Sequence, residues 1–120
     1  MRSKSIFHPT TEGTAYDWGA MTWHMDDGKV AGANVSVATM TVLPGKTSPA
    51  HRHNNVNEVI HVISGSTEQR VGDEWFAADE GSTVFVPEGA VHQTRNATAE
   101  PVTLLVTYSG GSRHYEEVDS

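Results

Sequence analysis

Residues that favour turns punctuate the chain along its whole length, and this pattern constrains the fold more than any other feature. Short runs rich in β-branched residues alternate with glycine, proline, asparagine and aspartate, and no window sustains the three-and-four spacing of an amphipathic helix. Gly72-Asp73, between two such runs, is typical of a tight hairpin. The sequence therefore predicts a nearly all-β protein, a sandwich or barrel with antiparallel connections.

Seven segments have the composition of strands. They are Ala33 to Leu43, Asn57 to Ser64, Ser66 to Val71, Glu74 to Ala77, Thr83 to Val86, Ala90 to Arg95 and Pro101 to Tyr108. Closing such strands into a barrel would remove exposed sheet edges.

The 120 residues suit one domain, which we divide into three parts. Residues 1–30 are rich in aromatic and methionine side chains without a clear strand period, and we expect them to cap the barrel or pack at a subunit interface. Residues 31–110 should form the barrel, and residues 111–120 a C-terminal tail.

The composition disfavours some classes of binding partner and limits the kinds of metal ligand. Eight basic against 15 acidic residues give a net charge of -7, which disfavours nucleic acid and anionic membranes. No apolar run is long enough to span a bilayer, and the start does not have the pattern of a secretory signal, so we expect a soluble cytoplasmic protein. The chain has no cysteine, so any metal must be held by nitrogen and oxygen ligands.

Two histidines one residue apart begin the most informative stretch. On an extended segment His51 and His53 point to the same face, because side chains alternate with period two. Glu58 follows at the head of an apolar run and shares its face with Ile60 and Val62, so a carboxylate is placed on a buried face. A cation would offset the cost of burying that charge.

A further histidine, His92, follows a rigid Pro87-Glu-Gly89 turn that fixes its direction. Three neutral imidazoles and one carboxylate suit one divalent transition metal per chain, such as Fe, Mn, Ni, Co, Cu or Zn. We assign His51, His53, Glu58 and His92 as metal ligands, and Glu58 and His92 as candidate catalytic residues. Glu58 could leave the ion to accept a proton.

The two stretches together resemble the two motifs of the cupin superfamily. The first has Gly, five residues, His-x-His, four residues, Glu, six residues and Gly, from Gly45 to Gly65. The second has Gly, five residues, Pro-x-Gly, two residues, His, three residues and Asn, from Gly81 to Asn96. The resemblance to small single-domain members, of the monocupin or cupin type 2 kind, implies a conical jelly-roll barrel, a double-stranded β-helix, with the metal inside its wider end. It also implies a homodimer.

Two other runs resemble a group of small cupins: Trp-Gly-x-Met-Thr-Trp from Trp18 to Trp23, and Ser-Gly-Gly-Ser-Arg from Ser109 to Arg113. Most of that group has proline after the histidine pair, whereas this chain has Asn54-Asn55. A cupin barrel without a working metal is the alternative, but such proteins usually show a broken ligand set, and here all four ligands are intact.

The remaining chemistry-bearing residues have structural interpretations. We expect His8, His24, His61 and His114 to be structural or surface groups, with His61 facing away from Glu58. Arg113, His114 and Tyr115 either reach the pocket or belong to a solvated tail. Tyr108, Phe85, Trp75 and Phe76 are expected in the core or an interface and not in a pocket.

Three functions fit a metal held this way. The first is a metal-dependent dioxygenase acting on a small enolisable or carboxylate substrate. The second is a redox-neutral isomerase or lyase acting on a sugar acid or hydroxycarbonyl, with the metal as Lewis acid. The third is a binding protein for a small ligand without turnover.

Overall fold

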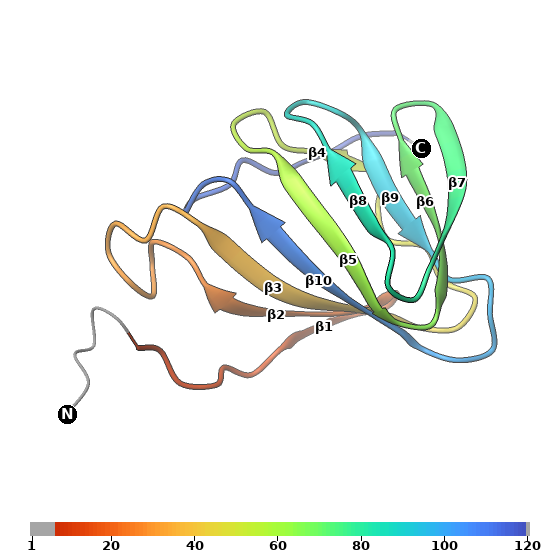
Figure 1. The fold of residues 1–120 in the computed structure, drawn as a ribbon, viewed down its shortest axis with the longest axis horizontal. Helices are drawn as coiled ribbons and strands as arrows, with labels where there is room; N and C mark the ends of the chain where they lie inside the picture. The colour runs from red at the N-terminus through yellow and green to blue at the C-terminus, as the bar shows by residue number, and fades with distance from the viewer. Residues whose placement is uncertain (1–6, 120) are drawn as a thin grey trace.

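The protein is an all-β barrel of two antiparallel sheets, as a computed structural model describing residues 7–119 shows (Figure 1). The six-stranded sheet has the order β1-β2-β3-β10-β5-β8, and the five-stranded sheet the order β11-β4-β9-β6-β7. The strands are β1 (Thr14–Tyr16), β2 (Gly19–Met25), β3 (Ser36–Val42), β4 (His51–Arg52), β5 (Glu58–Ser64), β6 (Ser66–Val71), β7 (Glu74–Asp79), β8 (Thr83–Val86), β9 (His92–Arg95), β10 (Val102–Tyr108) and β11 (Glu116–Glu117). The expected all-β class is confirmed.

All seven expected strands are present, some with different ends. β3 begins three residues later than expected, at Ser36, because Asn34 has a left-handed φ of 58° that interrupts the extended chain. β9 begins at His92 and not at Ala90, whose amide donates to the Pro87 carbonyl in the preceding turn. The expected hairpin at Gly72-Asp73 is present, with Val71 paired to Glu74 and Gly72 at a φ of 65°.

The sequence pattern missed four strands. β2 pairs with β3 of its own chain, from Gly19 opposite Val42 to Met25 opposite Val37, and its register shifts between Trp23 and Met25. That irregularity breaks the alternation of side chains, which explains why residues 19–25 show no strand period. β1, β4 and β11 are only two or three residues long, too short for a periodic signal.

The hydrophobic core fills the space between the sheets. Alternate residues of β3 and β10 are buried, and the inward members are mostly alanine, valine and leucine. Trp18 and Trp23, from the N-terminal segment, pack against this core, and Met21 belongs to it. Three of the aromatic residues expected in the core or an interface, and not in a pocket, are exposed: Phe85 by 58%, Phe76 by 37%, and Trp75, which lines a second cavity contrary to that expectation, by 37%. Their expected role in an interface stays a prediction.

Residues 7–119 contain no helix that is long and apolar enough to cross a membrane.

Candidate metal centre

The four predicted ligands come together at one point, although His92 is distant in sequence from the other three. His51 begins β4, His53 directly follows it, Glu58 begins β5 and His92 begins β9. His51 and His92 are opposite each other in the pairing of β4 with β9. One ligand atom from each of the four residues lies within 4.8 Å of all the others, which is close enough for the group to hold one metal ion.

Strand alternation accounts for this convergence. In β5 Glu58, Ile60 and Val62 are buried while Val59 and Ile63 are exposed, so the carboxylate enters the barrel on the apolar face. His61 faces away, as expected, and its Nδ1 lies 2.9 Å from the Thr83 hydroxyl.

Each of the three histidines is oriented by a backbone carbonyl. The Nδ1 atoms of His51, His53 and His92 lie 2.7, 2.6 and 3.0 Å from the carbonyl oxygens of Pro49, His114 and Ala90 respectively. A carbonyl oxygen only accepts, so each Nδ1 donates, and the Nε2 of each neutral ring then carries a lone pair. This is the tautomer that metal-binding histidines require.

The Nε2 lone pairs of His53 and His92 point at the Glu58 carboxylate, and no hydrogen-bond donor lies between these acceptors. Glu58 Oε1 lies 3.1 Å from His53 Nε2 and 2.9 Å from His92 Nε2, yet none of these three buried atoms has a hydrogen-bond partner among the described residues. Leaving several acceptors buried and unpaired is costly. A divalent cation with nitrogen and oxygen ligands would satisfy all of them, so the residues fit the metal that their sequence pattern predicts.

The electrostatics keep the ligands in their metal-binding forms. Burial is the main cause that lowers the pKa of His51 to about 3, which keeps this imidazole neutral and free to coordinate. Burial raises the pKa of the Glu58 carboxyl, but interactions with His53 and His92 outweigh burial and lower it to about 2. The site therefore presents an ionised carboxylate beside a neutral imidazole.

A cavity of about 610 Å³ opens beside these residues and is lined by His51, Glu58 and His92. Tyr108 also lines it, so the expectation that this residue would not face a pocket is wrong. Its pairing opposite Glu58 places the buried hydroxyl next to the carboxylate, and burial together with Glu58 raises the pKa of Tyr108 well above its usual range. The inward face of the run Val102 to Tyr108 is the signal that could have identified it.

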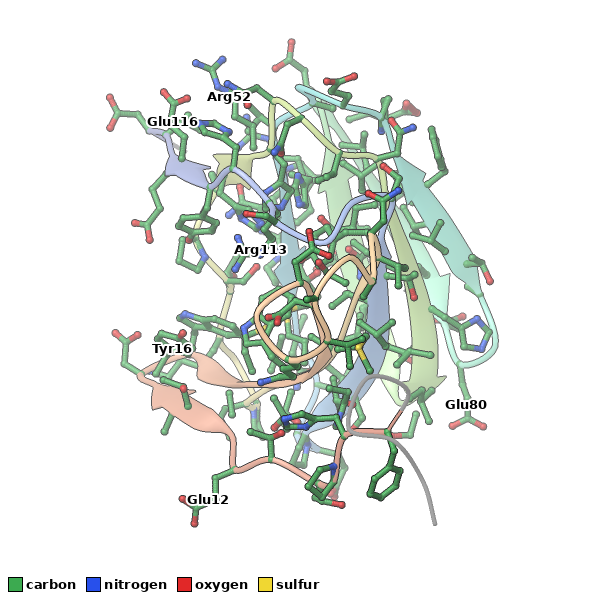
Figure 2. All side chains as sticks on the ribbon, turned by 90° about the vertical axis from the view of Figure 1, so that its left-hand side faces the viewer. Glu12, Tyr16, Arg52, Glu80, Arg113 and Glu116 are labelled. Atoms are coloured by element: carbon green, nitrogen blue, oxygen red, sulfur yellow. The ribbon has the colours of Figure 1, made fainter. Side chains whose placement is uncertain are left out.

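The C-terminal tail contributes to the wall of this cavity, so Arg113 and Tyr115 do reach the pocket. β11 pairs with β4, and the side chains of Arg113 and Tyr115 line the cavity. Figure 2 shows Arg113 between Tyr16 and the Arg52–Glu116 ion pair. His114 contributes its backbone carbonyl to His53, while its ring accepts a hydrogen bond from the amide of Asn54 at 3.0 Å.

The Asn54-Asn55 pair, unexplained by sequence, binds this tail. The Asn55 side chain donates to the Ser112 carbonyl at 2.9 Å and accepts from the His114 amide at 2.8 Å. Proline at position 54 would lack the amide that reaches His114. The asparagine pair thus connects the loop of the histidine ligands to the segment that orients one of them.

Comparison with known proteins agrees with this geometry. The Cupin domain family matches residues 38–108. The chain is similar to the xanthan biosynthesis protein XanB of Xanthomonas campestris, with 31% identity over 88 residues, which is 73% of this chain and 19% of that protein. It is also similar to a mannose-1-phosphate guanylyltransferase of Salmonella muenchen, with 32% identity over 67% of this chain and 17% of that one. A germin-like protein of Arabidopsis thaliana, subfamily 2 member 4, is 30% identical over 68% of this chain and 41% of that one. The chain therefore spans less than half the length of these relatives.

Solved structures share the fold. The oxalate decarboxylase of Bacillus subtilis superposes with a TM-score of 0.82 at 22% identity, covering 90% of this chain and 30% of that one. The oxalate decarboxylase of Lactobacillus farciminis superposes with a TM-score of 0.82 at 18% identity, covering 89% of this chain and 33% of that one.

Proposed function

The chain belongs to the cupin family. From that premise we propose that it is a metal-dependent enzyme that converts a small carboxylate or enolisable molecule. A dioxygenase-type reaction is the first candidate. One observation carries the proposal: three imidazoles and one ionised carboxylate converge beside a cavity large enough for a small molecule, and the facing atoms of His53, His92 and Glu58 have no hydrogen-bond partner among the described residues. His51, His53, Glu58 and His92 would hold one ion per chain.

The ion, when bound, would supply a Lewis acid and, if it is iron or manganese, an electron-transfer centre. The chain's own residues would bind and orient the substrate. Apolar side chains of Met21, Met40 and Ile60 line the same cavity and would exclude water from the bound molecule. The Tyr108 hydroxyl, which stays protonated, can donate a hydrogen bond to Glu58 or to a ligand oxygen.

The similar proteins support the choice of ion and substrate class. A structure of the Bacillus subtilis oxalate decarboxylase is described with Mn(II) centres, and the Lactobacillus farciminis enzyme was solved as a formate complex. Oxalate and formate are both carboxylates. We therefore propose manganese or iron as the ion and a carboxylate as the substrate class, in a cytoplasmic, homodimeric protein. Light scattering on the purified protein tests the dimer.

Oxygen uptake tests the reaction class. Protein reconstituted with Fe(II) is incubated with acetylacetone, phenylpyruvate and oxalate in an oxygen electrode, and substrate loss is followed in parallel. We expect oxygen consumption coupled to loss of at least one substrate, and none from His92→Ala protein. No uptake from any member of the panel would contradict the dioxygenase proposal.

A redox-neutral isomerase or lyase is the second candidate, and the relatives favour it. Mannose-1-phosphate guanylyltransferases are named for a sugar phosphate, which suggests a sugar-derived hydroxycarbonyl as substrate. Protein loaded with zinc or nickel that converts such compounds under anaerobic conditions would establish this class. Ligand binding without turnover in either assay would identify a binding protein.

A further inference from the structure

The guanidinium of Arg113 lies against three aromatic rings and has no ion-pair partner among the described residues. Its central carbon lies 4.6 Å from the ring centroid of Trp23, 4.9 Å from that of Tyr115 and 5.6 Å from that of Tyr108. These contacts are with ring systems, so they leave the N–H groups at the edge of the guanidinium available for hydrogen bonds.

The other arginines in the described part of the chain have polar partners. Arg52 pairs with Glu116 at 3.1 Å, Arg95 pairs with Glu68 at 2.9 Å, and Arg70 donates to Gln93 at 2.8 Å. No hydrogen bond or ion pair joins Arg113 to any residue within 7–119. A half-buried cation with unused donors is a binding group for an anion.

Arg113 faces the same cavity as the candidate ligands. Among the described residues that line this cavity it is the one arginine or lysine, and it shares the cavity with His51, Glu58 and His92. Met21, Met40 and Ile60 contribute apolar side chains to the wall of the same cavity. The arrangement suits a molecule with an acid group and an apolar body.

The acidic residues of the cavity favour a singly charged ligand. Asp26 accepts the amides of Gly28 and Lys29, and Glu117 accepts the Tyr115 hydroxyl at 2.9 Å, so these carboxylates have donors of their own. Asp27, which accepts the Asn34 amide, also lines the cavity. Counting Glu58, four carboxylates and one guanidinium line the cavity, and this negative balance disfavours a doubly charged phosphate.

We propose that Arg113 binds the carboxylate of a monoanionic ligand whose apolar body lies against Met21, Met40 and Ile60. The inference rests on the proposed function, because it names the substrate class for the cavity beside the candidate metal centre. It also assigns a role to the Ser-Gly-Gly-Ser-Arg run of the tail, since that run places Arg113 over Trp23.

Binding of benzoate to Mn(II)-loaded protein tests the proposal, with neutral benzamide and inorganic phosphate as comparison probes. Dissociation constants are measured by titration calorimetry for the wild type, Arg113→Gln and Arg95→Gln. Arg95 is the matched control because it also stacks on a tryptophan, Trp75, at 4.0 Å, but already pairs with Glu68.

We expect wild-type protein to bind benzoate more tightly than benzamide or phosphate. Arg113→Gln should weaken benzoate binding roughly 10- to 100-fold, as expected for loss of a charged hydrogen-bond partner, with little change for benzamide, whereas Arg95→Gln should change neither. A tail that had merely loosened would weaken both probes alike, so equal weakening of the two would overturn the proposal.

Two more outcomes would overturn it: an unchanged benzoate dissociation constant in Arg113→Gln, or a wild type that retains manganese but binds phosphate in preference to benzoate. Failure of the proposed function has a different signature. In that case the wild-type protein retains no manganese, which metal analysis of the same samples detects.

Discussion

What the candidate centre can bind depends on which ring nitrogen of each histidine carries the proton. Three backbone carbonyls fix the Nδ1 atoms of His51, His53 and His92 as donors, so the opposite nitrogens are acceptors that face Glu58. The period of a strand predicted that His51 and His53 share a face and that Glu58 lies on a buried face, and the Pro87-Glu-Gly89 turn predicted the direction of His92. The sequence did not predict the carbonyl partners, because His114 lies more than sixty residues from His53 and only the fold brings them together.

The pH dependence of the metal-free protein follows from two of these residues. In the folded state the pKa of His51 is lowered from 6.5 to about 3, and that of Glu58 from 4.5 to about 2. The unfolded chain therefore binds more protons than the folded chain, on His51 between pH 6.5 and 3 and on Glu58 between pH 4.5 and 2. The free energy of unfolding should consequently fall as the pH is lowered below 6.5.

Urea denaturation of chelator-treated protein at a series of pH values measures this effect. If the unfolded chain binds one more proton than the folded chain, the free energy of unfolding changes by about 1.4 kcal/mol per pH unit. The variant His51→Asn should show a shallower slope than the wild type between pH 6 and 5. Identical slopes in the two proteins would contradict the lowered pKa of His51.

At the scale of elements, the C-terminal tail is part of the candidate centre. Asn55 holds it through two hydrogen bonds, and the tail in turn supplies the His114 carbonyl to His53. Partners that orient metal ligands in this way typically contribute a factor of about 10 to 100 to metal affinity.

We therefore predict that Asn55→Ala weakens manganese binding roughly 10- to 100-fold while the barrel stays folded. Competition with a chromophoric chelator measures the affinity, and hydrogen exchange should show faster exchange at the His114 amide. Asn57→Ala is the matched control, because Asn57 lies in the same loop and its side chain accepts the Glu88 amide, not an amide of the tail. Equal metal affinity in Asn55→Ala and wild-type protein would contradict the role of the tail in metal binding.

The elements that sequence could predict are those with a regular period. β3, β5 and β10 alternate cleanly and were expected, whereas β2 carries a register shift and β4 and β11 are two residues long. Those last two strands bring His51 and the tail to the cavity. Asn55 was missed because its role depends on contacts with the tail that have no local pattern, whereas Tyr108 lies on the regular strand β10 and could have been identified from its inward face.

At the scale of the whole molecule, the barrel brings together two motifs that are separated in the sequence by the fifteen residues between Gly65 and Gly81. Turn chemistry predicted a sandwich or barrel, spacing and face arguments placed His51, His53, Glu58 and His92 on one ion, and the resemblance to cupins implied the jelly-roll barrel around them. They could not predict which other residues line the cavity, since its shape depends on how the two sheets and the tail pack together. Arg113 is a residue of that kind, brought over Trp23 by the tail.

The central claim is that these four residues hold one divalent ion per chain, and metal stoichiometry of purified variants tests it most directly. Wild-type protein, His92→Ala and the control His61→Ala are incubated with manganese, desalted and measured by mass spectrometry for metal and by circular dichroism for fold. We predict about one ion per chain in the wild type and in His61→Ala, and almost none in a folded His92→Ala, because a ligand is lost while the barrel remains. Equal metal content in His92→Ala and wild-type protein would contradict the claim.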